Sequence, residues 1–299
     1  MQINIIVNPI SGTKNAQRKA KCIVKVLEEH FNTKALYTAY AGHGFELTKQ
    51  LIAAGSDILI AVGGDGTVNE IASALIHSKT ALFIVPTGSG NGLARDLGMF
   101  GLSIQQIIRR IETNQAYFID AGSADGKAFF CTCGSGFDAL IGHLFAQTKV
   151  RGFLTYVKLS LKAYKDYQPL TYCLTTAQTK LKRQAFVINI ANNKQFGNNA
   201  YIAPKSDLMD GLFTVTIIKP FKWYHIPYMA FSLFFKRMHT NRFVETFDCG
   251  DCLLTMPIGG YLHVDGEPIN SYNQWLLKPK LSSLRCSRVG LYLYLRMLM

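Results

Sequence analysis

The sequence DILIAVGGDGTVNE, residues 57–70, decides the fold. It opens with a short apolar run at residues 58–62, as expected of a buried β-strand. Gly63 and Gly64 follow, and glycine permits the tight turn that joins a strand to a helix. We expect that helix to continue to about His77. The stretch therefore predicts one strand–turn–helix unit of a parallel sheet.

The same alternation extends over the first 120 or so residues. Further strands are expected at residues 3–8, 35–40 and 81–85, and further helices at residues 14–31 and 44–54. In the first of these helices, apolar residues recur at helical spacing, with Lys and Glu on the other face: Ala20, Ile23, Val24, Leu27 and Phe31. Repeated strand–helix units predict a three-layer α/β domain, with a parallel sheet between helices.

The pattern changes near residue 118. Most later segments are short, extended and bounded by Gly, Asn, Asp or Pro, with one helical interruption at residues 139–164. Such segments predict a mainly antiparallel β domain. We therefore predict an α/β domain at residues 1–122 and a β domain at residues 123–284, with a cleft between them. We leave open whether the tail, residues 285–299, completes the first domain.

Composition and charge narrow the range of functions. The 299 residues carry 32 Lys plus Arg against 19 Asp plus Glu, a net charge of +13. This balance favours an anionic partner, such as nucleic acid, an acidic membrane surface or phosphate groups. No apolar run reaches the roughly 18 residues of a spanning helix, and no basic segment precedes the first apolar run. With 7 cysteines and no sign of a disulfide scaffold, we expect a cytoplasmic protein.

Three polar, glycine-rich turns follow expected strands of the first domain, at residues 8–12, 63–67 and 87–91. The carboxyl ends of parallel strands share one sheet edge, so we expect these turns to converge. Glycine lets backbone N–H groups approach a ligand, and helix N-termini favour anions. The turns therefore predict a phosphate-binding cradle, although the chain has no Walker loop. GSGFDA at residues 134–139 lacks the later acid of a dinucleotide fingerprint, and we interpret it as a tight turn.

Four motifs occur in a fixed order: NPxSG at residues 8–12, GGDGTxNE at 63–70, GSGN at 88–91 and DGE at 265–267. In this order they resemble the diacylglycerol kinase catalytic-domain family, which includes bacterial soluble lipid kinases and the sphingosine and ceramide kinases. The resemblance covers residues 3 to about 279. It implies an N-terminal nucleotide-binding domain and a C-terminal β-sandwich, with ATP and a lipid meeting between them.

The resemblance also implies roles for individual residues. Asp265 would be the general base that takes the proton from a lipid hydroxyl, and Glu267 would support the metal and water network. Asp65 would organise Mg²⁺ through water beside the phosphates, and Asp120 would lie near the same metal. The implied ATP contacts are Asn8, Pro9, Ser11, Gly12, Thr38, Gly63, Gly64, Asp65, Gly66, Thr67, Asn69, Glu70, Gly88, Ser89 and Asn91.

Each acid also has a purely structural interpretation. Asp65 can form an Asx turn, Asp120 can end a strand, and HVDGEP can be an ordinary β-turn, in which Asp and Gly are preferred. The resemblance further implies a second, structural Mg²⁺ at Asp207, Asp210 and the Leu212 carbonyl, because oxygen ligands suit this ion. The alternative is a loop with a pair of Asp residues.

A lipid substrate requires access to a bilayer. Residues 222–237, KWYHIPYMAFSLFFKR, place aromatic and aliphatic residues between cations, a pattern typical of segments at headgroup depth. A core helix of the second domain is the other interpretation. The expected partners are a membrane lipid and an anionic membrane surface, without nucleic acid, and a homodimer is left open.

We expect an ATP- and Mg²⁺-dependent lipid kinase at the inner face of the membrane, with diacylglycerol as substrate and phosphatidic acid as product. Residues 91–95, NGLAR, depart from the NDFAR of many bacterial members, and GSGN is closer to the sphingosine kinases. A sphingoid base or ceramide therefore stays open as the substrate. An NAD kinase would explain GGDG but not the first and last motifs. A non-catalytic lipid- or nucleotide-binding module would fit the basic charge equally well.

Overall fold

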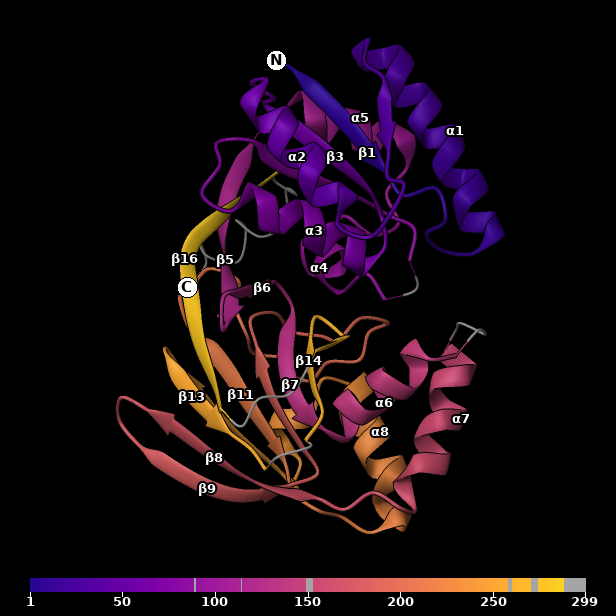
Figure 1. The fold of residues 1–299 in the computed structure, drawn as a ribbon. Coiled ribbons are helices and arrows are strands. Elements are labelled where there is room, and N and C mark those ends of the chain that lie inside the picture. Colours follow the sequence, from indigo (N-terminus) through magenta and orange to yellow (C-terminus); the bar gives the residue numbers. More distant parts are fainter. Residues whose placement is uncertain (89, 114, 149–152, 258–259, 270–273, 288–299) are drawn as a thin grey trace. The chain divides into compact units, whose positions relative to one another are not determined.

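The computed structural model divides the chain into two compact units (Figure 1). Unit 1 comprises Met1–Ile119 and Ser282–Met299, and unit 2 comprises Asp120–Leu281. The structure describes residues 1–88, 90–113, 115–148, 153–257, 260–269 and 274–287. Each unit is described below by itself.

Unit 1 contains a parallel sheet with the strand order β2-β1-β3-β4. Its strands are β1 (Ile3–Val7), β2 (Ala35–Tyr37), β3 (Ile58–Gly63) and β4 (Ala81–Pro86). Every residue of β3 is buried, which explains why its sequence is one continuous apolar run rather than an alternating one. The prediction of an α/β domain with a parallel sheet is confirmed.

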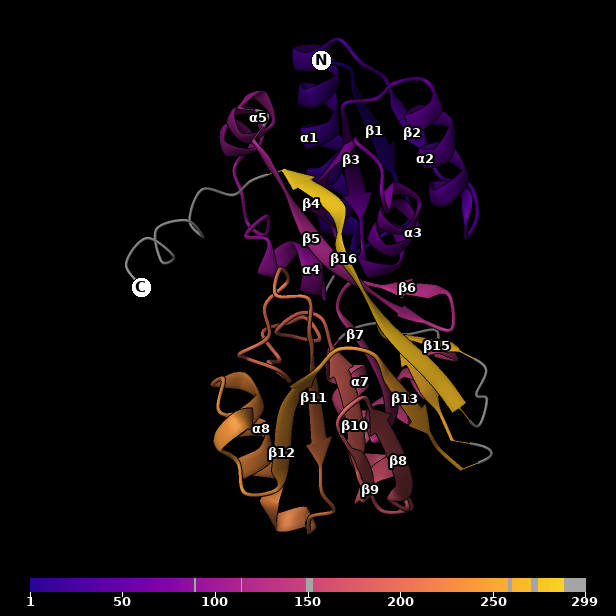
Figure 2. The ribbon, with the colours of Figure 1, turned by 90° about the vertical axis from the view of Figure 1, so that its left-hand side faces the viewer.

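Helices cover both faces of this sheet. They are α1 (Lys14–Phe31), α2 (His43–Ala53), α3 (Asp65–Leu75), α4 (Gly92–Asp96) and α5 (Ile104–Glu112). The side chain of Thr13 caps α1 by accepting the Ala16 N–H, and the helix buries Ala20, Val24 and Leu27. α1 contacts α5 and α2 contacts α3, and Figure 2 shows these pairs on opposite sides of the sheet. This is the three-layer arrangement that the sequence predicts.

Unit 2 is built from antiparallel strands in two sheets. One sheet has the order β12-β11-β10-β7-β14-β15, and β8, β9 and β13 belong to the other. The strands are β6 (Lys127–Phe129), β7 (Thr132–Gly136), β8 (Leu170–Thr176), β9 (Lys180–Ala185), β10 (Val187–Ala191), β11 (Phe213–Ile218), β12 (Val244–Cys249), β13 (Cys252–Thr255), β14 (Leu262–Val264) and β15 (Glu267–Ile269). One core cluster joins residues of both sheets, among them Ile190, Val215, Leu174 and Leu254. The predicted antiparallel β-sandwich is confirmed.

Helices also belong to unit 2: α6 (Phe137–Ala146), α7 (Phe153–Tyr164), η1 (Trp223–His225), α8 (Ile226–Phe234) and η2 (Met238–Thr240). A second core cluster joins α6, α7, α8 and η2 to β10 and β11 through residues such as Tyr164, Val187, Ile218 and Leu233. The helical interruption predicted at residues 139–164 is thus two helices, α6 and α7. Within the described part of the chain, no helix is long and apolar enough to cross a membrane.

Two strands pass from one unit to the other. They are β5 (Ala116–Ala124) and β16 (Gln274–Ser287), and the predicted domain limits at residues 122 and 284 fall inside them. Because an extended strand rather than a loop carries the chain across, no linker composition marks the change of unit. Residues 288–299 of the predicted tail lie outside the described residues.

Candidate functional site

The three glycine-rich turns of unit 1 pack against one another after β1, β3 and β4. A Cβ atom on Gly88 would lie 2.9 Å from the Gly64 Cα, and a Cβ atom on Gly12 would overlap the carbonyl oxygen of Thr87. Gly12 also has a φ of 80°, in the region that favours glycine. A side chain at any of these glycines would force the turns apart, so the motif glycines are required for the turns to meet.

Side chains of the first turn tie it to the other two. The Asn8 Nδ2 donates to the Thr67 Oγ1 at 2.8 Å, and the Thr87 hydroxyl donates to the Ser11 Oγ at 2.9 Å. The Asn8 Oδ1 accepts the Ile10 N–H at 3.1 Å, which closes an Asx turn. The first turn is therefore bonded to both the second and the third.

Asp65 joins the second turn to the third. Its carboxylate accepts the N–H groups of Asn91 at 2.9 Å and Gly92 at 3.0 Å, at the start of α4. Burial raises the pKa of Asp65 above its ordinary value, although these two N–H groups and the charge of Arg95 lower it. The carboxylate thus has a structural role at a helix N-terminus, and its implied role toward Mg²⁺ stays a prediction.

Glu70, at the other end of the GGDGTVNE motif, holds the start of α2. Its two oxygens accept the Gly42 N–H at 2.7 Å and the Gly44 N–H at 3.0 Å. Thr38 lies between β2 and α2, where its N–H donates to the Val7 carbonyl at 2.9 Å. Thr38 is thus bonded to the residue that precedes the first turn, and its role as a nucleotide contact stays a prediction.

Asn91 is buried in a left-handed conformation with a φ of 50°. Its Nδ2 donates to the Gly88 carbonyl, whereas its Oδ1 has no hydrogen-bond partner among the described residues. The remaining predicted contacts occupy the same turns: Pro9 is exposed, Gly63 ends β3, and Gly66 and Asn69 belong to α3. Ser89 lies outside the described residues.

Asp265 is held in unit 2 by the segment that leads into β7. Its Oδ1 accepts the N–H groups of Cys131 at 2.8 Å and Thr132 at 3.0 Å, and its Oδ2 accepts the Phe130 N–H at 2.9 Å. The Asp265 N–H in turn donates to the Thr132 carbonyl at 2.8 Å. Backbone groups therefore fix the orientation of this carboxylate. Glu267 begins β15 with an exposed side chain.

Asn192 lies against the same segment, and no sequence motif marks it as a functional residue. Its Nδ2 donates to the Asp120 carbonyl at 3.0 Å and to the Phe130 carbonyl at 3.2 Å. It is buried, and its Oδ1 has no hydrogen-bond partner in the described part of the chain. Asn192 thus links Asp120 to the segment that holds Asp265, so the structure brings these two predicted acids to one region of unit 2.

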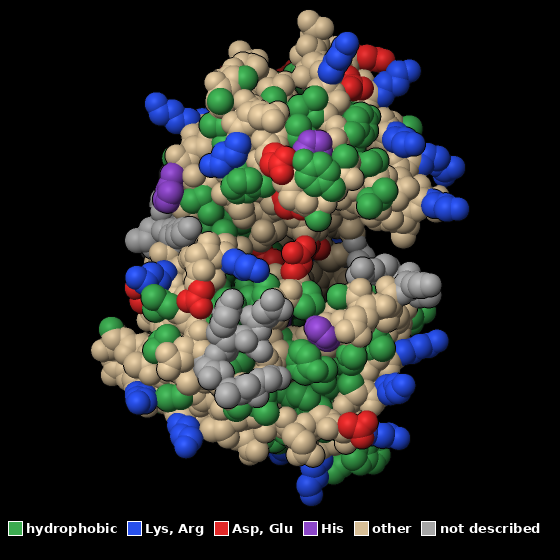
Figure 3. Space-filling model, viewed as in Figure 1, with side chains coloured by type: hydrophobic (Ala, Val, Ile, Leu, Met, Phe, Trp, Pro, Cys, Tyr) green, Lys and Arg blue, Asp and Glu red, His purple; other side chains and the backbone are tan. Residues whose placement is uncertain are grey.

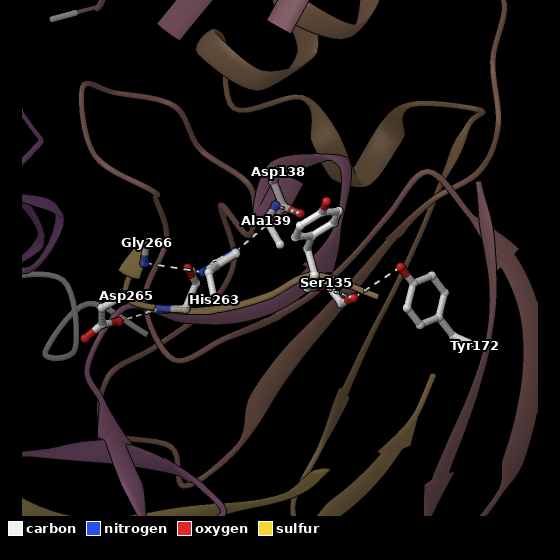
Figure 4. A network of polar contacts seen from close by, with 9 residues as sticks. Ser135, Asp138, Ala139, Tyr172, His263, Asp265 and Gly266 are labelled. Atoms are coloured by element: carbon white, nitrogen blue, oxygen red, sulfur yellow. Dashed lines mark hydrogen bonds and ion pairs between the residues drawn. The ribbon is translucent and has the colours of Figure 1, made fainter. Parts of the chain in front are cut away.

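His263 and Asp138 form a buried pair beneath the turn that carries Asp265 (Figure 4). The His263 Nε2 lies 3.0 Å from the Asp138 Oδ2, and the His263 Nδ1 accepts the Gly266 N–H at 3.3 Å. This pattern requires the proton on Nε2, which donates to Asp138. Asp138 belongs to the GSGFDA stretch, which we interpreted as a tight turn only, so sequence reasoning missed both residues.

The predicted second metal site forms a loop next to Asp120. The Asp120 Oδ2 accepts the Gly211 N–H at 2.8 Å, while Asp207 and Asp210 accept the N–H groups of Met209 and Leu212. Burial raises the pKa of Asp210, and the neighbouring acids Asp207, Asp248 and Asp120 raise it further. Among the described residues, no group of three or more His, Cys, Asp or Glu side chains is arranged to hold a metal ion. The site with two side chains and one carbonyl therefore stays a prediction.

Comparisons with known proteins agree with both units. Residues 2–124 match the family model of the diacylglycerol kinase catalytic domain, and residues 131–272 match that of the YegS C-terminal NAD kinase beta sandwich-like domain. The chain is 28% identical to the "Probable lipid kinase YegS-like" of Shewanella frigidimarina, over 69% of this chain and 68% of that protein. It is 26% identical to the "Diacylglycerol kinase" of Bacillus subtilis, over 72% of this chain and 73% of that protein.

A solved structure of a diacylglycerol kinase from Bacillus anthracis has a similar fold. Its TM-score is 0.72 at 16% identity, and the superposition covers 97% of both chains. At this identity the likeness concerns the fold alone, and it extends over both units.

Proposed function

Because the chain belongs to the diacylglycerol kinase catalytic-domain family of lipid kinases, we propose that it transfers the γ-phosphoryl group of ATP to the hydroxyl group of diacylglycerol and so forms phosphatidic acid. The observation that carries the proposal is the contact between the three glycine-rich turns of unit 1. Phosphoryl transfer depends mainly on positioning and on neutralising charge, and such a cradle supplies both.

In this proposal the turns bind the phosphates of ATP. The backbones of Gly64 and Gly88 meet without side chains between them, and glycine lets backbone N–H groups approach a phosphate closely. The N-terminus of α3 follows directly after Gly64 and favours an anion. When bound, Mg²⁺ would neutralise charge on the phosphates. We assign to Asp65 a role toward this ion through water.

We assign the general base to Asp265. A base must be held within hydrogen-bond reach of the proton that it abstracts, and three backbone N–H groups orient the Asp265 carboxylate. Glu267 and Asp120 would support the metal and water network. For the second Mg²⁺ we propose Asp207, Asp210 and the Leu212 carbonyl. Burial and then repulsion from the neighbouring acids raise the pKa of Asp210, and a bound cation would offset that repulsion.

A second candidate is transfer to a sphingoid base or ceramide. The GSGN sequence of the third turn, which resembles the sphingosine kinases more than many bacterial members, favours it. Both candidates use the same cradle and the same base and differ only in the acceptor. Either acceptor would place the protein at the inner face of a membrane, and we propose that location.

The decisive experiment supplies ATP labelled at the γ-phosphate to the full chain, with a panel of diacylglycerol, sphingosine, ceramide and NAD in detergent micelles. We expect label in phosphatidic acid. Label in a phosphorylated sphingoid base or ceramide would establish the second candidate, and label in NADP would overturn the lipid-kinase assignment. ATP binding without transfer to any acceptor would identify a non-catalytic module.

The assignment of the base has its own test. Asp265→Asn should lower lipid phosphorylation by roughly 10²–10⁴-fold, the contribution of a positioned base. The matched control is Asp166→Asn, which changes an exposed acid of the same unit and should leave the rate unchanged. Turnover of Asp265→Asn close to that of the control would remove Asp265 from this role.

A further inference from the structure

Helix α8 is apolar on both of its faces. Its inner face packs Met229 and Leu233 against the second core cluster of unit 2. Its outer face and the preceding η1 expose aromatic side chains: Trp223, Tyr224, Tyr228, Phe231, Phe234 and Phe235. We call these six residues the η1–α8 surface. A helix that is hydrophobic all round is normally buried, so this one lacks a cover for its outer face.

The exposure is large and concentrated in a short segment. Trp223 is 72% exposed, Phe235 64% and Phe231 51%, all within residues 223–235. Exposed aromatic residues gathered in this way mark a surface that contacts an apolar partner. Tyr and Trp, with one apolar and one polar end, suit a boundary between water and hydrocarbon.

Hydrogen bonds hold the helix firmly with this face outward. The Asn241 Nδ2 donates to the Ser232 Oγ at 2.8 Å, and the Asn241 Oδ1 accepts the Phe243 N–H at 2.9 Å. The Tyr201 N–H donates to the Leu233 carbonyl at 2.9 Å. Figure 2 shows α8 beside β12 at the side of unit 2. The aromatic exposure is therefore a property of the folded unit.

The segment that forms the surface carries one sign of charge. Residues 219–243 contain no Asp or Glu, and their cations are Lys219, Lys222, Lys236, Arg237 and Arg242. Three of these cations lie over aromatic rings. Lys222 Nζ is 6.0 Å from the Tyr224 ring centroid, Lys236 Nζ is 4.6 Å from that of Tyr201, and Arg242 Cζ is 4.8 Å from that of Phe243. On the face seen in Figure 3, Lys and Arg are interspersed with Asp and Glu, so a run of cations without acids is not general to the molecular surface. Lys219 also pairs with Glu245 of β12, whose Oε2 lies 3.8 Å from the Lys219 Nζ, so the cations that we assign to the lipid are Lys222, Lys236, Arg237 and Arg242. Aromatic residues flanked by such cations are complementary to an anionic lipid surface.

We propose that the η1–α8 surface docks unit 2 on an anionic lipid bilayer, with the aromatic side chains at headgroup depth and the cations on the lipid phosphates. The proposal rests on the proposed function, because a kinase of a membrane lipid must reach its acceptor at such a surface. Each cation near an anionic surface strengthens binding roughly fivefold, so a few suffice for a measurable effect.

The experiment uses Trp223 as an internal probe. The chain has 2 tryptophans, and Trp275 is buried, so the difference in emission between the wild type and Trp223→Phe reports Trp223 alone. Vesicles of phosphatidylcholine with phosphatidylglycerol should shift this emission to the blue and should sediment the protein. Vesicles of phosphatidylcholine alone should do neither. An unshifted Trp223 emission on vesicles that sediment the protein would overturn the proposal.

Two pairs of substitutions separate the contribution of the aromatic side chains to vesicle binding from that of the cations. Phe231→Ser/Phe235→Ser and Lys222→Glu/Arg237→Glu should each weaken vesicle binding by roughly tenfold or more. The matched control is Arg18→Glu/Lys21→Glu, which makes the same change of charge on exposed residues of α1 and should change binding less than twofold. Equal loss with the control would show a nonspecific charge effect and overturn the docking surface. So would self-association that Phe231→Ser/Phe235→Ser abolishes while vesicle binding stays intact.

The test distinguishes this proposal from the proposed function. Phosphorylation of short-chain diacylglycerol in detergent micelles does not require a bilayer and should survive all three pairs of substitutions. Micellar activity without specific vesicle binding would overturn the docking surface and leave the kinase in place. Specific vesicle binding by a protein that phosphorylates no lipid would do the reverse.

Discussion

The dipeptide Asp-Gly occurs in the critical turn of each unit and adopts two different structures. In unit 1, Asp65 is the first residue of α3. In unit 2, Asp265 and Gly266 form a two-residue hairpin turn between β14 and β15, and both have positive φ angles, 48° and 79°. Such a turn favours Asp-Gly because both of its residues need this conformation.

Despite this difference, both carboxylates accept hydrogen bonds from backbone N–H groups of a distant segment. Asp65 accepts backbone N–H groups 26 and 27 residues away, and Asp265 accepts backbone N–H groups 133 to 135 residues away. Each motif acid therefore anchors a distant segment of its own unit. The chemistry proposed for each acid depends on a geometry that the acid itself helps to hold.

Removal of each anchor should have the largest effect on stability. Asp265→Ala leaves three N–H groups without their acceptor and should cost about 3 kcal/mol in unit 2, whereas Asp65→Ala leaves two and should cost about 2 kcal/mol in unit 1. Hydrogen exchange should accelerate at residues 130–132 in the first variant and at residues 91–92 in the second. Each variant is the control for the other, and acceleration at both places in either variant would contradict local anchoring.

The local part of this comparison could be predicted from the sequence. The apolar run before Gly63 fixes β3, and an Asp-Gly pair between short strands is typical of a hairpin turn. The partners of the carboxylates could not be predicted, because nothing local in residues 130–132 marks them as donors to Asp265. The same holds for Asn192 and for the His263–Asp138 pair, whose members are 125 residues apart. Contacts of this kind depend on the packing of strands that are distant in sequence.

The buried pair of His263 and Asp138 lies beneath the Asp265 turn. Loss of this pair should lower the stability of unit 2 by less than loss of Asp265 does. His263→Ala leaves the Gly266 N–H and the Asp138 carboxylate without their partner and should lower the free energy of unfolding of unit 2 by about 2 kcal/mol. Thermal unfolding followed by circular dichroism would measure it. His239→Ala changes an exposed histidine of the same unit and is the control. Equal stability of the two variants would show that the buried pair does not support the turn.

Substitution of the glycine in each Asp-Gly pair, Gly66 and Gly266, should show that only the second pair requires a left-handed backbone conformation. Gly266→Ala places a side chain at a φ of 79°, with no described atom within 4 Å of its Cβ, so strain alone should cost about 1 kcal/mol. Gly266→Asn should cost less, because Asn tolerates this conformation. Gly66 lies in α3, and Gly66→Ala should change stability by no more than about 0.5 kcal/mol. Urea unfolding of the three variants checks the order, and a loss at Gly66 equal to that at Gly266 would contradict it.

The smallest effect concerns Asp210 of unit 2. Burial raises the pKa of both Asp210 and Asp65, but neighbouring acids raise that of Asp210 further, whereas the charge of Arg95 lowers the pKa of Asp65. Burial and the neighbouring acids raise the pKa of Asp210 above its ordinary value of 3.8. Below pH 3.8 the folded and unfolded states both carry the proton. As the pH rises further, the unfolded state releases the proton first, so the free energy of unfolding falls. In Mg²⁺-free buffer, Asp210→Asn should therefore gain stability relative to the wild type between pH 4 and pH 7.

Added Mg²⁺ turns this pH dependence into a test of the predicted metal site. A cation bound by Asp207, Asp210 and the Leu212 carbonyl would favour the charged form of Asp210 and stabilise the folded state. In the absence of ATP, Mg²⁺ at pH 7 should raise the melting temperature of the wild type and leave that of Asp210→Asn unchanged. An equal rise in both proteins would remove these residues from metal binding. The acids of the loop would then be held by their N–H donors alone.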